Sequence, residues 1–140
     1  MSDNFRWARA AALFAIVYLA VGVLFPNPSA ADAMQFAWRL AAWLICFTAF
    51  LTHIWFERSR LRSLPRRAAL HVAAAVAVGG LGLAAVANIH ARVAGSGNLR
   101  LLALALVIWP VMTALPAFVV ALAVASGLAR LRPRQTQHPS

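Results

Sequence analysis

The stretch ERSRLRSLPRR, residues Glu57 to Arg67, places five arginines within eleven residues and separates two long apolar runs. Residues 36–56 precede it and residues 68–89 follow it, and each run matches the roughly 20 apolar residues that a transmembrane helix needs. Two further apolar runs cover residues 10–25 and 101–128. The sequence therefore predicts an all-α polytopic membrane protein, an antiparallel bundle of four transmembrane helices with short loops.

The composition supports lipid as the solvent of these runs. The chain has 140 residues, of which 63% are hydrophobic and 11% are charged, against about 25% charged residues in soluble domains. Its net charge is +10, and the 13 residues counted as Lys+Arg are all arginine. In a soluble chain this charge would indicate nucleic-acid binding, but here the arginines flank apolar runs, and residues 57–67 contain no aromatic side chain for base stacking. We expect the bilayer and its anionic phospholipid headgroups as partners, and no nucleic acid.

The predicted spans cover about residues 8–25, 35–56, 68–90 and 101–128, within a single transmembrane domain of residues 1–132. Residues 133–140 are expected to form a disordered cytoplasmic tail. The fourth run of 28 residues would make a straight helix of about 42 Å, longer than a hydrocarbon core of about 30 Å. Pro110 and Pro116 each remove a backbone donor, which predicts a kink in this helix.

Arginine counts predict the orientation of the chain. The N-terminal end carries Arg6 and Arg9, five arginines lie in residues 57–67 and three follow the last span, while the opposite side carries Arg92 and Arg100, with Arg39 just inside the second span. Cytoplasmic segments are the ones enriched in arginine. We therefore expect a bacterial cytoplasmic (inner) membrane protein with both termini inside and a single orientation. A cleaved signal peptide, ending at Ala31-Asp32-Ala33, is the alternative interpretation of the first run.

Polar residues share one face of the second predicted helix. Cys46, His53 and Glu57 follow Arg39 by 7, 14 and 18 residues, offsets that return to nearly the same angle at about 100° per residue. Trp43 lies on the same stripe. We expect this candidate polar face to turn toward the bundle interior; alternatively, Arg39 and Glu57 extend outward from the two ends of the helix.

Two histidines flank the arginine-rich stretch at similar distances. His53 lies four residues before Glu57 and His71 four residues after Arg67, so a helical hairpin would bring them to similar depth. Such a pair could ligate haem b and make the protein a redox carrier. Neighbouring helices pack only about 8–10 Å apart, which disfavours a haem held from both sides. Interfacial, hydrogen-bonded histidines are the competing interpretation.

Small residues recur along the third predicted helix. Gly80, Ala84 and Asn88 are spaced by four residues, and Gly82 lies on the same face as His71. Small residues let helices approach closely in lipid, so this pattern predicts helix packing. The same surface could contact a partner helix or a second copy of the chain.

The sequence lacks the motifs of common enzymes. Its only acidic residues are Asp3, Asp32 and Glu57, and it has one cysteine, no glycine-rich phosphate loop and no HExxH motif. We therefore expect a non-enzymatic structural, assembly or accessory subunit that acts through helix contacts. The alternatives are a haem-b or quinone-linked redox protein using His53 and His71, and a small transport unit using the Arg39 face and the Pro110/Pro116 kink.

Overall fold

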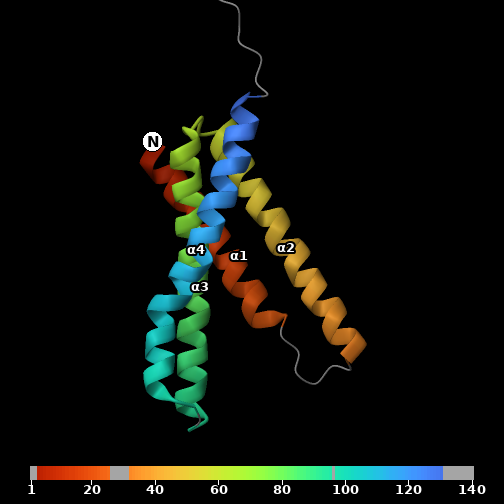
Figure 1. The fold of residues 1–140 in the computed structure, drawn as a ribbon, viewed down its shortest axis with the longest axis vertical. Coiled ribbons are helices and arrows are strands. Elements are labelled where there is room, and N and C mark those ends of the chain that lie inside the picture. The colour runs from red at the N-terminus through yellow and green to blue at the C-terminus, as the bar shows by residue number, and fades with distance from the viewer. Residues whose placement is uncertain (1–2, 26–31, 96, 131–140) are drawn as a thin grey trace, which may run out of the picture.

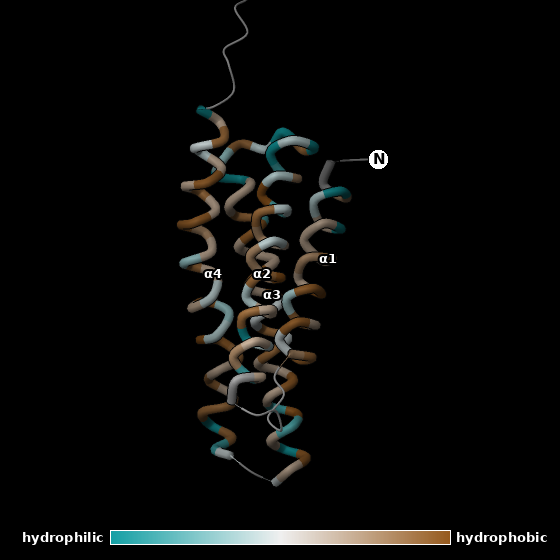
Figure 2. Tube along the Cα trace, turned by 90° about the vertical axis from the view of Figure 1, so that its right-hand side faces the viewer, coloured by the Kyte–Doolittle hydropathy of each residue, from teal (hydrophilic) through white to brown (hydrophobic). Residues whose placement is uncertain are grey.

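The computed structural model describes residues 3–25, 32–95 and 97–130. These residues form four helices: α1 (Asp3–Leu24), α2 (Asp32–Ser59), α3 (Pro65–Val93) and α4 (Leu99–Arg130). Each helix is long and apolar enough to cross a membrane (Figure 2). The predicted all-helical class and the four candidate membrane spans are thereby confirmed. The predicted tail and residue 31 of the alternative cleavage site lie outside the described residues.

The helices extend further than the apolar runs that predicted them. The longest, α4, has 32 residues, and α2 and α3 have 28 and 29. Polar residues such as Gln35, Arg58 and Arg100 continue the helical backbone, because glutamine and arginine are good helix formers whatever their hydropathy. The apolar pattern located each helix but underestimated its length.

The four helices form one elongated body (Figure 1). α3 and α4 lie side by side over most of their length, and α1 packs against α3. The start of α1, the α2–α3 connection and the end of α4 gather at one end of the molecule. Toward its own N-terminal end, α2 diverges from the α3–α4 pair (Figure 1). The helices are therefore closest together near the arginine-rich connection.

The buried core lies near that connection and consists mainly of small side chains. It joins α2, α3 and α4 through Ile54, Ala68, Ala69, Val72, Ala121 and Ala125. Alanine has no side chain beyond Cβ, so the helix backbones can approach closely and gain dispersion contacts. This contact holds α2 against the α3–α4 pair.

Glycines in the middle of α3 permit close approach on two sides. A Cβ at Gly79 would lie 2.8 Å from Cβ of Tyr18 in α1, and one at Gly80 would lie 2.9 Å from Oγ1 of Thr113 in α4. Gly82 faces α1, where a Cβ would lie 3.0 Å from the Leu19 side chain. The predicted packing residues thus divide between two neighbours, and the spacing analysis did not identify Gly79.

The rest of the small-residue stripe faces α4. Ala84 and Asn88 are each 6% exposed. The Asn88 amide donates to the carbonyl of Ala84 at 2.9 Å and to that of Leu102 in α4 at 2.7 Å. An amide buried between apolar helices is thereby hydrogen-bonded, and it fixes the register of α3 against α4.

Both prolines lie inside α4, which continues as one helix through Pro110 and Pro116. The helix changes direction about midway along its length (Figure 1). The hydroxyl of Thr113 donates to the carbonyls of Trp109 at 3.0 Å and Pro110 at 3.1 Å. These are not the carbonyls four residues before each proline, which lose their donors. The Thr113 hydroxyl therefore satisfies neither of the carbonyls that the prolines leave without a donor.

Candidate functional site

Glu57 forms the centre of a buried polar cluster at the end of α2. Its side chain is fully buried, and Oε2 accepts a hydrogen bond from the Ser63 hydroxyl at 2.8 Å. Nδ1 of His71, in α3, lies 3.0 Å from the same oxygen. Nε2 of His53, one turn before Glu57, lies 4.0 Å from Oε1, which is too long for a hydrogen bond. We call His53, Glu57 and His71 the His–Glu–His cluster.

Aromatic side chains of α1 cover both histidines. The Trp7 ring stacks on His71 with centroids 4.4 Å apart and an interplanar angle of 9°. Two turns further along α1, Phe14 stacks on His53 at 4.2 Å and 12°. Sequence reasoning missed both contacts, although the seven-residue spacing of Trp7 and Phe14 places them on one face of a helix. One face of α1 thus holds both imidazoles in place.

The α2–α3 connection is tied to the same carboxylate. Ser63 donates its backbone N–H to the carbonyl of Glu57 at 3.1 Å, and the Arg58 guanidinium donates to the carbonyl of Ser63. Arg62, just before Ser63, has φ +48°, a left-handed conformation that is uncommon for residues other than glycine. The contacts of Ser63 hold the chain in this turn. Ser63 carries no sequence signal that sets it apart from the other residues of the connection.

The inner part of the cluster has unused hydrogen-bonding capacity. Among the described residues of the cluster, Oε1 of Glu57 and both ring nitrogens of His53 are buried without a hydrogen-bond partner. A buried polar group without a partner costs about 1–3 kcal/mol relative to a paired one. The outer half, formed by Glu57, Ser63 and His71, is hydrogen-bonded. Within the described chain, the cluster is therefore hydrogen-bonded on its His71 side and without hydrogen bonds on its His53 side.

The arrangement does not fit a haem held between the two histidines. A bis-histidine haem requires a nitrogen of each ring to point at the iron from opposite faces of the porphyrin. Here Nε2 of His53 and Nδ1 of His71 both approach the Glu57 carboxylate, and one face of each ring is covered, by Phe14 and by Trp7. Within the described residues, no group of three or more His, Cys, Asp or Glu side chains is placed to hold a metal ion.

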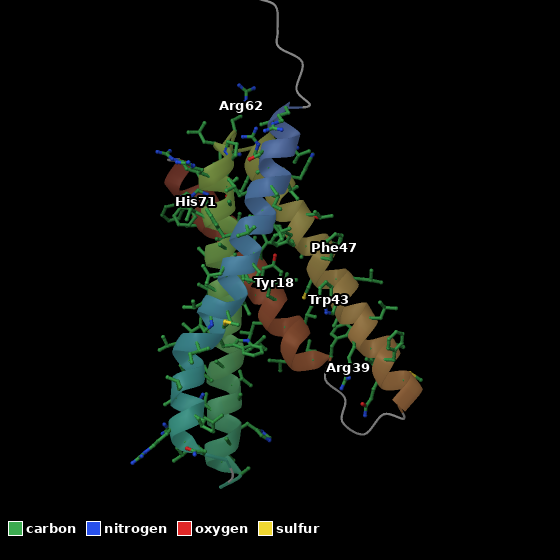
Figure 3. The ribbon with its side chains drawn as sticks, viewed as in Figure 1. Tyr18, Arg39, Trp43, Phe47, Arg62 and His71 are labelled. Atoms are coloured by element: carbon green, nitrogen blue, oxygen red, sulfur yellow. The ribbon has the colours of Figure 1, made fainter. Side chains whose placement is uncertain are left out.

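The predicted polar face of α2 is buried at only one end. His53 and Glu57 are fully buried and Cys46 is half-buried, whereas Arg39 is exposed and Trp43 is 74% exposed. Figure 3 shows Arg39 and Trp43 on the diverging half of α2, far from His71. The stripe is continuous along the helix, but its neighbours cover only the half near the α2–α3 connection. The structure therefore does not bring Arg39 and Trp43 together with the histidines.

Comparisons with known proteins identified no relative: no family model, no curated protein and no solved structure matches this chain.

Proposed function

We propose that this chain is an integral protein of a bacterial cytoplasmic membrane, an antiparallel four-span bundle that acts as a structural, assembly or accessory subunit through helix contacts. The arginines support its orientation: Arg6, Arg9, the five arginines of residues 57–67 and Arg130 belong to segments that gather at one end. Cytoplasmic segments carry such an excess. On this proposal both termini lie inside.

The exposure of Trp43 carries the functional part of the proposal. This side chain is 74% exposed on the helix face that buries Glu57 two heptads later, and Arg39 is exposed one turn before it. Arginine within a membrane span normally faces protein or an interface, because lipid does not solvate it. Tryptophan and arginine are also enriched where proteins bind each other. The diverging half of α2 therefore suits a helix of another subunit or of a second copy.

A second exposed surface, on α4, has a different character. Its large exposed side chains include Val107, Val119 and Val120, and residues 101–128 contain no charged side chain. A uniformly apolar helix face is already well solvated by acyl chains. We therefore assign this face of α4 to lipid and the Arg39–Trp43 face of α2 to protein.

Site-specific photocrosslinking in the native membrane tests this assignment. A photoreactive amino acid replaces Trp43 in one variant and Val119 in another, because both positions are highly exposed. We expect an adduct of defined mass from position 43 and none from position 119. Equal adducts at the two positions, or none at position 43, would refute contact through α2.

The redox alternative rests on His53 and His71, whose nearest nitrogens approach a carboxylate. It predicts a Soret band from the purified protein that disappears in His53→Ala and His71→Ala. The transport alternative predicts anion flux in proteoliposomes that depends on Arg39. Arg39 lies on the diverging half of α2, whereas Pro110 packs beside Gly80 of α3, so no observation favours a shared path for these two residues.

A further inference from the structure

A pocket opens beside His71 at the arginine-rich end of the molecule. Its volume is about 460 Å³, within the range of about 300–1,000 Å³ of small-ligand sites. Three segments form its walls: the start of α1, the α2–α3 connection and the first turns of α3. The lining residues are Trp7, Leu61, Arg62, Ser63, Leu64, Arg67, Leu70 and His71.

Two of the lining residues bring uncompensated positive charge. Arg62 and Arg67 are exposed, and within the described part of the chain neither guanidinium has a hydrogen bond or an ion pair. The Glu57 carboxylate beside the pocket already accepts from Ser63 and faces His71. The positive charge of the pocket is therefore available to an external anion. Arginine is well suited to phosphate, which it binds through two parallel hydrogen bonds.

The backbone at Arg62 is held in a defined turn. Its φ of +48° is held by the contacts of Ser63 with Glu57 and Arg58. A non-glycine residue in this region persists only where its surroundings fix it, and such residues are frequent at ligand sites. Arg62 and Arg67 thus line the pocket from the connection and from α3, and these two segments are joined through Glu57, which accepts from Ser63 and faces His71.

The remaining wall is apolar and identifies the kind of anion. Leu64 and Leu70 are 67% and 58% exposed, and Trp7 stands beside them with its ring against His71. An inorganic phosphate has no group that would contact these side chains. A phospholipid presents a phosphate next to a glycerol and acyl chains, which match arginines beside leucines and a tryptophan.

We propose that this pocket binds the headgroup of one anionic phospholipid, with Arg62 and Arg67 on its phosphate and Trp7, Leu64 and Leu70 against its glycerol and upper acyl chains. This inference rests on the proposed membrane insertion. The inference goes beyond that insertion because it names one lipid bound at defined residues. A basic loop without a pocket would attract many anionic lipids without binding one of them specifically. The bound lipid would join α1 to the α2–α3 connection.

Native mass spectrometry of the full chain, released from detergent with phosphatidylglycerol or phosphatidylcholine, tests this site. The test variant is R62Q/R67Q and the matched control is R60Q/R66Q. Both remove two arginines from the same eleven-residue stretch, but Arg60 and Arg66 do not line the pocket. We expect the wild type and R60Q/R66Q to retain one phosphatidylglycerol, and R62Q/R67Q to bind it about tenfold more weakly, since two charge-assisted contacts are lost.

Three results would overturn the lipid site. Equal loss of phosphatidylglycerol in both double variants would indicate general attraction by a basic loop. Equal retention of phosphatidylcholine and phosphatidylglycerol would show that net negative charge is not selected. Displacement of phosphatidylglycerol by millimolar inorganic phosphate would identify a free-phosphate site. Far-UV circular dichroism verifies that each variant keeps its helices.

Membrane insertion is measured separately, so that the two proposals can fail independently. Wild type and variants are reconstituted in phosphatidylcholine vesicles and extracted with alkaline carbonate, which removes proteins that are not embedded. Retention of all variants in the vesicles, together with unchanged lipid binding by R62Q/R67Q, would refute the pocket alone. Extraction of the wild type would refute the proposed membrane-spanning role itself.

Discussion

Glu57 joins three segments of the chain through a single side chain. It is part of α2, accepts from Ser63 in the connection and faces Nδ1 of His71 in α3. The residue pattern predicted that His53 and His71 reach similar depth, and both do approach one carboxylate. It did not predict that Glu57 lies between them, because that depends on how the connection folds back. This turn depends on the positive φ of Arg62, and the sequence gives no indication of it because the residue is not a glycine.

Removal of the Glu57 carboxylate should weaken the fold more than removal of any exposed hydroxyl nearby. Glu57→Ala leaves the Ser63 hydroxyl and His71 without their partner and opens space in a fully buried position. We expect the free energy of unfolding in detergent to fall by about 2 kcal/mol. Ser59→Ala, which removes an exposed hydroxyl bonded to the Trp55 carbonyl, is the control and should change it by less than about 0.5 kcal/mol. Similar losses in the two variants would contradict a central role for Glu57.

The two histidines should respond differently to replacement by phenylalanine. His53→Phe preserves a stacked ring against Phe14 and removes two buried nitrogens without partners, so stability should be unchanged or rise by about 1 kcal/mol. His71→Phe preserves the stack on Trp7 but leaves Glu57 with one fewer donor, so stability should fall by about 1–2 kcal/mol. Thermal unfolding of both variants in the same detergent measures the difference. A large loss in His53→Phe would contradict the lack of hydrogen-bond partners, among the described residues, for the His53 nitrogens.

At the scale of the helices, α3 is the element against which α1 and α4 pack. Gly79 and Gly82 face α1, while Gly80, Ala84 and Asn88 face α4. The four-residue spacing predicted a packing surface on α3. The spacing did not predict which helix each of these residues contacts, because in an alanine-rich helix small residues occur on every side. The same limit applies to α2: periodicity identified its polar face, but the divergence of its N-terminal half depends on the packing of the other helices.

Adding one methyl group at Gly79 should disturb the α1–α3 contact. The new Cβ would lie 2.8 Å from Cβ of Tyr18 and 3.3 Å from the Ala15 carbonyl oxygen, so α1 itself would have to shift. We expect Gly79→Ala to lower the free energy of unfolding by about 1–3 kcal/mol. Gly127→Ala, where a Cβ meets nothing within 4 Å, is the matched control and should be neutral or stabilising by up to about 1 kcal/mol. Equal effects would show that α1 and α3 are not closely packed at Gly79.

The start of α3 offers room for a stabilising substitution. Leu64 occupies the N-cap position with an extended backbone, and no side chain caps the helix. Serine at this position can accept a hydrogen bond from a free N–H of the first turn. Leu64→Ser should therefore raise the free energy of unfolding by about 1 kcal/mol, as seen by thermal denaturation in detergent. Leu70→Ser, which changes an exposed leucine of the same pocket within the helix, serves as the control and should give no such gain.

For the whole molecule, the apolar runs were sufficient to predict four helices because each run is long and is separated from the next by a short segment with polar residues or prolines. Two features of the helix arrangement cannot be predicted from the lengths of the apolar runs. The start of α1, the arginine-rich connection and the end of α4 meet at one end, and α2 is held to the α3–α4 pair mainly there. Most of the arginines, the His–Glu–His cluster and the proposed lipid pocket thus lie at one end of the molecule. The proposal as a whole therefore depends on which side of the membrane that end faces.

Cysteine accessibility in intact cells measures this side. In a Cys46→Ser background, which removes the only native cysteine, single cysteines replace Arg60 in the α2–α3 connection and Asn98 in the α3–α4 connection; both positions are exposed. A membrane-impermeant maleimide added from outside is predicted to label Asn98→Cys, and to label Arg60→Cys only after the cells are opened. Labelling of Arg60→Cys in intact cells, with Asn98→Cys protected, would contradict the proposed orientation.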